Sequence, residues 1–245
     1  MKSIMKTFFY LILAFFSISI QANEQRYYDV EIIIFENLDI KARQSEKWPS
    51  SVELEYPESS LQVGHPWPGH IPKEYNPKLS FKRLFKKELR LSEQVKKIEE
   101  SDSRRVLLHT GWRQPGMPKD TALTVKIKKT IPAHNNIAEN EPSSLQYSNT
   151  AQISPWAAQE AGELEGKIQV ILARYLHVNA DLIFQTQKLK TNDIYQFENA
   201  VKEEIKPVVF RLNQTRRRMR SRELHYIDNP VLGLLVLITP YELTQ

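Results

Sequence analysis

The sequence has 245 residues, of which 41% are hydrophobic and 26% are charged, a composition typical of a globular protein. It contains no cysteine, which excludes disulfides, thiol nucleophiles, cysteine-ligated zinc or iron–sulfur sites and a lipid anchor on an N-terminal cysteine. Its seven glycines form neither a G-x-G-x-x-G nor a G-x-x-x-x-G-K pattern, which argues against a nucleotide-phosphate loop.

Residues 1–22 have the pattern of a secretory signal peptide. Lys2 and Lys6 precede an apolar run from Phe8 to Ile20, and Ala22 ends the segment before a polar stretch. The run is shorter than the roughly 20 residues that a membrane-spanning helix needs. We therefore expect cleavage and a periplasmic location. An uncleaved anchor is the alternative, and the exact cleavage site stays open.

The charge of the exported chain points to a class of partners. Removal of the signal peptide lowers the formal net charge from +5 to +3, because this segment carries two lysines and no acidic residue. Outside the cytoplasm, a basic surface meets anionic wall polymers, lipid head groups or acidic proteins. Nucleic acid is therefore not an expected partner.

The remaining chain, residues 23–245, is expected to form a single domain. Residues 28–35 are rich in β-branched and aromatic side chains and predict a first strand. Residues 38–78 contain six prolines and predict a long irregular loop. Residues 79–100 place apolar side chains at helical spacing, with Ser80 as a suitable N-cap, and predict one long amphipathic helix.

Three further segments have the patterns of strands. Residues 106–112 and 123–127 predict a second and a third strand. Residues 168–184 carry apolar side chains at the even positions, and only Arg174 interrupts the series. A single strand of this length would span roughly 55 Å. We therefore expect it to be bent, bulged or broken into a hairpin near His177–Asn179.

The C-terminal third completes the predicted sheet. Residues 130–163 are weakly patterned and predict a second long irregular loop. Residues 208–212 and 216–227 predict a hairpin around Asn213–Gln214, and residues 231–238 predict a closing strand. The expected fold class is α+β: one antiparallel, curved or partly closed sheet of about seven strands, with the long amphipathic helix packed on it.

Signatures of enzymes are absent from the sequence. It contains no G-x-S-x-G or H-E-x-x-H motif, and its S-x-x-K match, Ser3–Lys6, lies in the predicted signal peptide. Its six histidines are scattered, so we predict no metal site, no cofactor and no catalytic residue. Carboxylates are plentiful, but no pair of them has a pattern that selects it as the acid and base of a glycosidase.

An arginine-rich segment is the first candidate binding site. Six arginines lie within the twelve residues 211–222. On a regular strand, four of them would share one face at intervals of about 6.7 Å: Arg216, Arg218, Arg220 and Arg222. Guanidinium groups suit carboxylates and phosphates, so such a row fits a linear polyanion such as the peptide stems of the cell wall. The alternative is that these arginines pair with acidic residues on neighbouring strands.

Exposed aromatic residues are the second candidate. Trp48 and Trp67 lie in the first proline-rich loop, and Trp156 follows a proline in the second loop. A tryptophan framed by prolines can present a flat face to a sugar ring or to a protein partner. The alternative is that each indole folds back onto the sheet. Trp112 ends a predicted strand and is expected in the core.

Four segments resemble the CsiV family of periplasmic peptidoglycan-binding proteins. They are Tyr28–Glu36, Leu107–Pro115 with its H-x-G-W-R-Q-P motif, Leu172–His177 and Arg217–Asp228. The resemblance implies a secreted, non-enzymatic protein that binds peptidoglycan and supports cell-wall synthesis. It also implies assistance to a penicillin-binding protein, with an outer-membrane lipoprotein activator as the expected partner. No binding residue is carried over from the family.

Two other functions stay open at this point. The chain could be an adaptor of the envelope that binds a protein through its tryptophan loops, with incidental wall contact. It could also be a peptidoglycan-modifying enzyme, which the release of soluble muropeptides would reveal.

Overall fold

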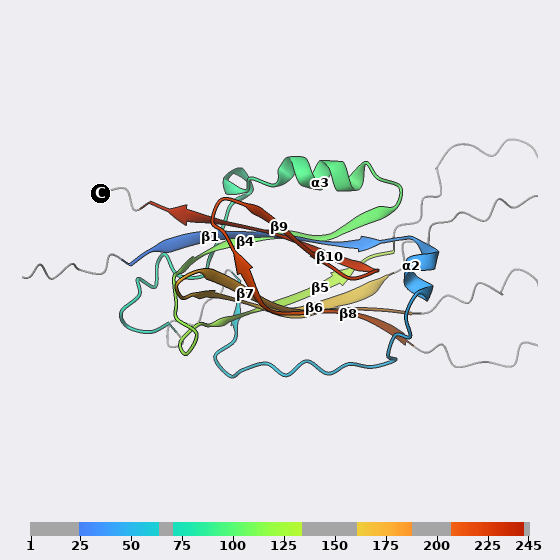
Figure 1. Cartoon of the computed structure of the whole chain (residues 1–245), viewed down its shortest axis with the longest axis horizontal. Coiled ribbons are helices and arrows are strands. Elements are labelled where there is room, and N and C mark those ends of the chain that lie inside the picture. The colour runs from blue at the N-terminus through green and yellow to red at the C-terminus, as the bar shows by residue number, and fades with distance from the viewer. Residues whose placement is uncertain (1–24, 64–70, 134–160, 188–206, 243–245) are drawn as a thin grey trace, which may run out of the picture.

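The computed structural model describes residues 25–63, 71–133, 161–187 and 207–242, which form two five-stranded sheets (Figure 1). The first sheet has the order β3 (Lys82–Arg83), β4 (Arg104–Pro115), β1 (Tyr27–Asn37), β10 (Leu232–Tyr241) and β9 (Leu224–Asp228). The second has the order β2 (Leu61–Gln62), β5 (Thr124–Ile131), β6 (Gly162–Leu172), β7 (Leu176–Gln187) and β8 (Pro207–Met219). Neighbouring strands are antiparallel except for the parallel pair of β2 and β5.

The main core lies between the two sheets. Ile32 and Ile34 of β1 belong to the same buried cluster as Ile168 of β6 and Leu182 of β7. The fully buried Trp112 of β4 also belongs to it, as its sequence context predicts. Alternate residues of each strand therefore fill the space between the layers, and this burial is the main force that holds the sheets together.

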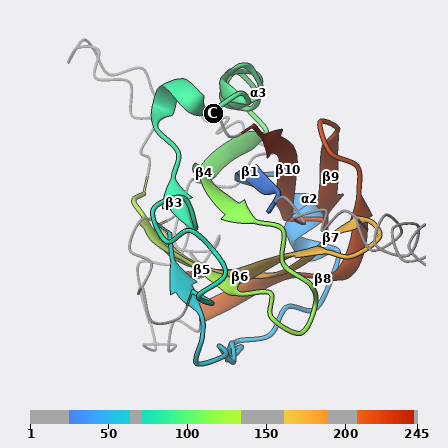
Figure 2. The same ribbon diagram turned by 90° about the vertical axis from the view of Figure 1, so that its left-hand side faces the viewer.

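A second, smaller cluster explains why β1 is apolar on both faces. Ile33 and Phe35 point away from the main core and pack with Leu91 and Ile98 beneath helix α3 (Ser92–Glu99). Figure 2 shows that α3 lies on the face of the first sheet that is turned away from the second sheet. The molecule is thus layered as helix, sheet and sheet.

The prediction of one seven-stranded sheet with a long helix over residues 79–100 is wrong. This segment contains the short strand β3, the 3-10 helix η2 (Lys86–Glu88) and the eight-residue α3. Its apolar side chains serve two separate cores, since Phe81 enters the main cluster while Leu91 and Ile98 enter the outer one. One straight helix cannot reach both cores. Backbone pairing with the edge of β4 therefore replaces the first helical turns.

A hairpin within residues 168–184 is present, but its turn lies at residues 173–175 between β6 and β7 and not near His177–Asn179 as expected, because those residues lie inside β7. The hairpin expected around Asn213–Gln214 is not present, because β8 runs through these residues to Met219. The chain then turns at residues 220–223 and enters the first sheet as β9. This turn therefore connects the second sheet to the first.

The remaining expectations concern loops and targeting. In the described residues of the loop 38–78, the regular elements are the short helix α2 (Ile40–Gln44) and β2, in accord with its prolines, and residues 64–70 lie outside the described residues. Residues 1–22 and most of 130–163 lie outside the described residues, so the signal peptide and the second loop stay predictions. In the part of the chain that the structure describes, no helix is long and apolar enough to cross a membrane.

Candidate functional site

A β-bulge in β8 decides where its arginines lie. Val178 pairs with Arg217, whereas Ala180 pairs with Gln214, so Thr215 and Arg216 together stand opposite Asn179. Arg216 adopts a left-handed conformation with φ of 50°, and its N–H donates to Oδ1 of Asn179 over 2.7 Å. The extra residue reverses the inward–outward alternation of the strand beyond this point.

The reversal has a clear cause in the core. Leu212 and Met219 are both buried in the main cluster, although they lie seven residues apart. On a regular strand, residues an odd number apart point to opposite faces. The bulge therefore allows both side chains to enter the core, and it turns Arg218 outward, opposite His177.

Arg218 belongs to an exposed cluster that we call the arginine–tyrosine cluster: Arg174, Tyr175 and Arg218. Cζ of Arg218 lies 3.5 Å from the centre of the Tyr175 ring, and Cζ of Arg174 lies 5.5 Å from the same centre. The Tyr175 side chain is 38% exposed. Within the described residues, no acidic side chain forms an ion pair with either arginine. The cluster thus presents two guanidinium groups around one ring.

Two amides beside the cluster, those of Asn179 and Gln169, are already paired. Nδ2 of Asn179 donates to Oε1 of Gln169 over 2.8 Å, and Nε2 of Gln169 donates to the carbonyl of Ala122 over 2.8 Å. These amides fix the bulge and leave the charged groups of the cluster as the groups available to a ligand.

Further along β8, Arg211 is paired with Asp181. Nε and Nη2 of Arg211 donate to the two carboxylate oxygens over 2.8 and 2.9 Å. Burial of Asp181 raises its pKa, but the hydrogen bond and charge of Arg211 outweigh this effect, and the pKa lies below its ordinary value. Arg211 therefore has a structural role.

The four arginines predicted to form a row do not share one face. Arg216 lies in the bulge, and Arg220 and Arg222 lie in the turn after β8 ends. Arg220 pairs with Glu223 at 3.5 Å, and Arg222, with φ of 66°, lies 4.0 Å from Glu242. The straight row is therefore wrong, because the strand is interrupted twice. A role of these residues in binding stays a prediction.

Of the three candidate tryptophans, Trp48 lies in the described residues, and it is not the exposed anchor that was expected. Trp48 is half-buried, its ring packs edge-on against Phe210 at 5.1 Å, and its Nε1 donates to the carbonyl of Arg43 over 2.7 Å. This arrangement fits the alternative in which the indole folds back onto the sheet. Trp67 and Trp156 lie outside the described residues. Contact of these three residues with a glycan or partner stays a prediction.

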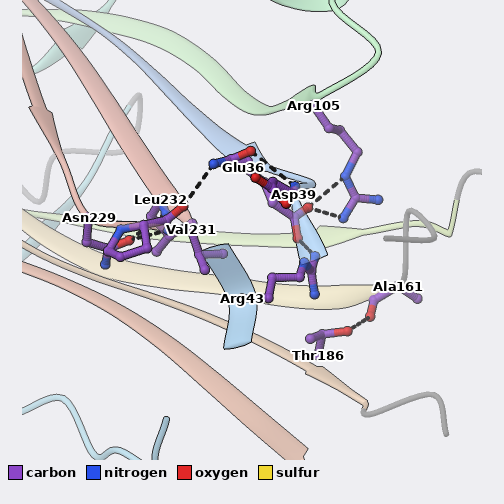
Figure 3. Close-up of polar contacts among 11 residues, drawn as sticks. Glu36, Asp39, Arg43, Arg105, Ala161, Thr186, Asn229, Val231 and Leu232 are labelled. Atoms are coloured by element: carbon purple, nitrogen blue, oxygen red, sulfur yellow. Dashed lines mark hydrogen bonds and ion pairs between the residues drawn. The ribbon is translucent and has the colours of Figure 1, made fainter. Parts of the chain in front are cut away.

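An internal ion-pair cluster holds the Trp48 segment in place. Figure 3 shows Arg43 and Arg105 directed at the carboxylate of Glu36. The Glu36 side chain is fully buried, and Arg105 donates to its Oε2 through Nε and Nη2 over 3.1 and 2.7 Å. Arg43 also stacks on Phe210 at 5.0 Å. A buried carboxylate with two cations of the same chain is a structural element that joins the sheets.

The family model described as "Peptidoglycan-binding protein, CsiV" matches residues 7–241, nearly the whole chain. The chain belongs to the CsiV family. No curated protein and no solved structure matches it. The resemblance inferred from the four sequence segments is thereby confirmed. The family description identifies peptidoglycan as the ligand class of these proteins.

The H-x-G-W-R-Q-P motif of this CsiV chain is structural. His109 Nε2 lies 2.7 Å from Oε1 of the buried Glu31. Arg113 forms hydrogen bonds of 2.7 and 3.1 Å with Asp29 and stacks on Tyr241 at 3.3 Å. Gln114 accepts from Trp112 Nε1 over 2.8 Å. The side chains of the motif therefore stabilise the first sheet.

Sequence reasoning missed Arg174 and Tyr175 as candidate ligand contacts. The available signal was the interruption of the apolar alternation at Arg174, which marks the turn between β6 and β7. Their closeness to Arg218 follows from strand pairing and could not be derived from spacing. In the described part of the CsiV chain, no group of three or more histidine or acidic residues could hold a metal ion.

Proposed function

We propose that this CsiV protein is a non-enzymatic periplasmic accessory protein that binds peptidoglycan through the arginine–tyrosine cluster. The observation that carries the assignment of the site is the stacking of Arg218 on Tyr175 at 3.5 Å, beside a second arginine, Arg174. The ligand groups would be the carboxylates of the peptide stems.

Stacking prepares Arg218 for a carboxylate. A guanidinium that lies on an aromatic ring uses its face for the ring, and its in-plane N–H groups stay available for bidentate hydrogen bonds. The ring also restricts a long side chain, so less conformational entropy is lost on binding. Arg174, 5.5 Å from the ring centre, adds a second positive charge to the same surface.

Co-sedimentation with isolated sacculi across a salt series tests this proposal. We expect the protein to pellet at low salt and to be released as salt rises, because surface charges are screened within about 10 Å at 0.1 M ionic strength. The double variant R174A/R218A should pellet less and show a weaker salt dependence. The variant K96A/K97A removes two exposed cations from α3 and should behave like the wild type.

Two outcomes would contradict the proposal. Equal binding of R174A/R218A and the wild type, with the fold intact, would exclude the cluster as the site. Soluble muropeptides in the supernatant would contradict the absence of enzymatic activity. Sacculi whose carboxyl groups have been amidated provide a chemical control. The wild type should bind them less than untreated sacculi, whereas R174A/R218A should bind both equally.

We further propose that the protein supports cell-wall synthesis through an envelope partner, namely a lipoprotein activator of a penicillin-binding protein. The edge strand β9 supports this role, because Leu224 and Tyr226 are 43% and 49% exposed there. An exposed sheet edge with apolar side chains can pair with a strand of another chain. The variant L224S/Y226S should lose capture of the activator and keep sacculus binding. Loss of both properties, or of neither, would contradict this assignment.

A further inference from the structure

The segment that runs from β3 towards α3 combines an exposed phenylalanine with several exposed cationic side chains. We call residues 82–90 the Phe85 knuckle. The Phe85 side chain is 60% exposed, more than any other large hydrophobic side chain among the described residues. Five cationic side chains accompany it, and all are exposed: Lys82, Arg83, Lys86, Lys87 and Arg90.

The exposure of Phe85 is built into the fold. The preceding residue, Leu84, is buried, and its N–H donates to the carbonyl of Gly111 over 2.9 Å. The N–H of Phe85 itself donates to Oε2 of Glu88 over 2.7 Å, and Oε1 of Glu88 lies 3.5 Å from Nη2 of Arg113. The backbone on both sides of Phe85 is therefore fixed, and the ring is held outward.

The described residues leave most of the charge of the knuckle unneutralised. Glu88 is the single acidic residue in residues 82–90, and it is already engaged by the Phe85 N–H and by Arg113. Nζ of Lys82 lies 5.5 Å from the centre of the Phe85 ring. Within the part of the chain that the structure describes, none of the five cations forms an ion pair.

We propose that the Phe85 knuckle binds the surface of an anionic phospholipid bilayer. A fixed, exposed aromatic ring on a basic segment matches the interface of such a membrane, where aromatic side chains enter the boundary between head groups and acyl chains. The cations would lie against the phosphates, each strengthening the partition onto the membrane by about fivefold. A purely ionic polymer would make no use of the exposed ring.

The knuckle and the arginine–tyrosine cluster lie on different sheets. The knuckle follows β3 at the edge of the first sheet, whereas Tyr175 and Arg218 belong to the second sheet. Membrane binding is therefore a function separate from wall binding, and one molecule could contact both surfaces. It does not depend on the proposed role of Arg174 and Arg218.

Vesicle co-sedimentation with the purified protein tests the proposal. The probes are vesicles of phosphatidylcholine alone and vesicles that contain about 30% phosphatidylglycerol, whose negative surface potential attracts basic segments. We expect binding to the anionic vesicles only. The variant K86Q/K87Q should bind about 25-fold more weakly, since it loses two cations at about fivefold each. The matched variant K73Q/K119Q, which removes two exposed lysines elsewhere, should bind like the wild type.

The variant F85S separates insertion from simple charge attraction. At low salt, F85S should still bind the anionic vesicles weakly. At higher salt, the wild type should stay bound and F85S should not. Because Phe85 is exposed, the far-ultraviolet circular dichroism spectrum and melting temperature of F85S should match those of the wild type. Its binding to sacculi should be unchanged. Absence of wild-type binding to anionic vesicles would overturn the proposal. So would equal binding of F85S and the wild type, or of K86Q/K87Q and K73Q/K119Q.

Discussion

Arg218 lies directly opposite His177 in the pairing of β7 with β8, and a single hydrogen-bonded bulge brings it there. Without the extra residue, Arg218 would point toward the core and Met219 toward solvent. The bulge thus connects a packing requirement to the position of a candidate ligand-binding side chain. It also brings Arg218 within 3.5 Å of the Tyr175 ring centre.

Asn179 is expected to hold this bulge. Asn179→Ala removes the acceptor of the Arg216 N–H and the donor to Gln169. We expect a loss of about 1–3 kcal/mol in the free energy of unfolding, since typical hydrogen bonds contribute about 1 kcal/mol each and an unsatisfied donor costs more. Urea denaturation measures this loss, and sacculus binding should fall with it. Gln185→Ala, a change at an exposed position of the same strand, should alter neither quantity. Equal stability of N179A and the wild type would show that the bulge does not depend on this amide.

Glu31 is expected to anchor α3 to the first sheet. Its buried carboxylate accepts from the backbone N–H groups of Arg90 and Leu91 over 2.7 and 2.8 Å and contacts His109. Glu31→Gln should lower the free energy of unfolding by about 2–4 kcal/mol, because charge-assisted hydrogen bonds are lost in a buried site. Hydrogen exchange should show faster exchange of the α3 amides. Glu99→Gln, at an exposed position of α3, is the control. Unchanged protection of α3 in E31Q would contradict the anchoring role.

The pair of Asp181 and Arg211 predicts a pH dependence of stability. The pKa of Asp181 is lowered in the folded protein, since the hydrogen bond and charge of Arg211 outweigh the effect of burial. A lowered folded pKa contributes stability above the unfolded pKa, about 3.9 for aspartate, and the contribution is lost as pH falls through the folded value. We expect Asp181→Asn to be less stable than the wild type at pH 7 and the difference to shrink below pH 4 or so. Chemical denaturation of both proteins at pH 7 and below about pH 4 measures this difference in the free energy of unfolding. A difference that stays constant with pH would rule out the linkage.

Gly233 permits the close approach of Phe35 in the neighbouring strand. A Cβ at this position would lie 2.3 Å from Cζ of the Phe35 ring, which is itself buried. Gly233→Ala should therefore lower the free energy of unfolding by about 1–3 kcal/mol, the usual range for overpacking. In a Phe35→Ala background the same change should cost much less, and a double-mutant cycle followed by denaturant unfolding measures the coupling. Additive effects would mean that the ring can move away at little cost.

The sequence identifies most of the strands because their burial is local and periodic. Residues 28–35, 106–112, 123–127 and 231–238 were predicted as strands, and each lies largely within β1, β4, β5 and β10. A hairpin between β6 and β7 was one of the expected alternatives, but its turn lies at the interruption by Arg174 and not near His177–Asn179. The odd spacing of Leu212 and Met219 is the one signal of the bulge in β8, and it is visible only when both residues are known to be buried.

The long helix could not be rejected from its periodicity. Residues 81–98 have a helical spacing of apolar side chains, but Phe81 and Leu91 belong to different cores. The sequence pattern records that a side chain is buried and does not record against which layer. Pairing of Lys82 and Arg83 with the edge of β4 is a tertiary interaction that overrides the local preference.

By itself, the sequence determined that cysteine chemistry is absent, that the chain is rich in strands and that it resembles a known family. It also predicted an export signal. Only the tertiary structure decided that the strands form two sheets and that Arg174, Tyr175 and Arg218 meet on one surface. It also decided that Phe85 is held outward on a basic segment. The physical reason is that strand pairing joins residues more than forty positions apart, and the register of that pairing depends on the packing of the whole core.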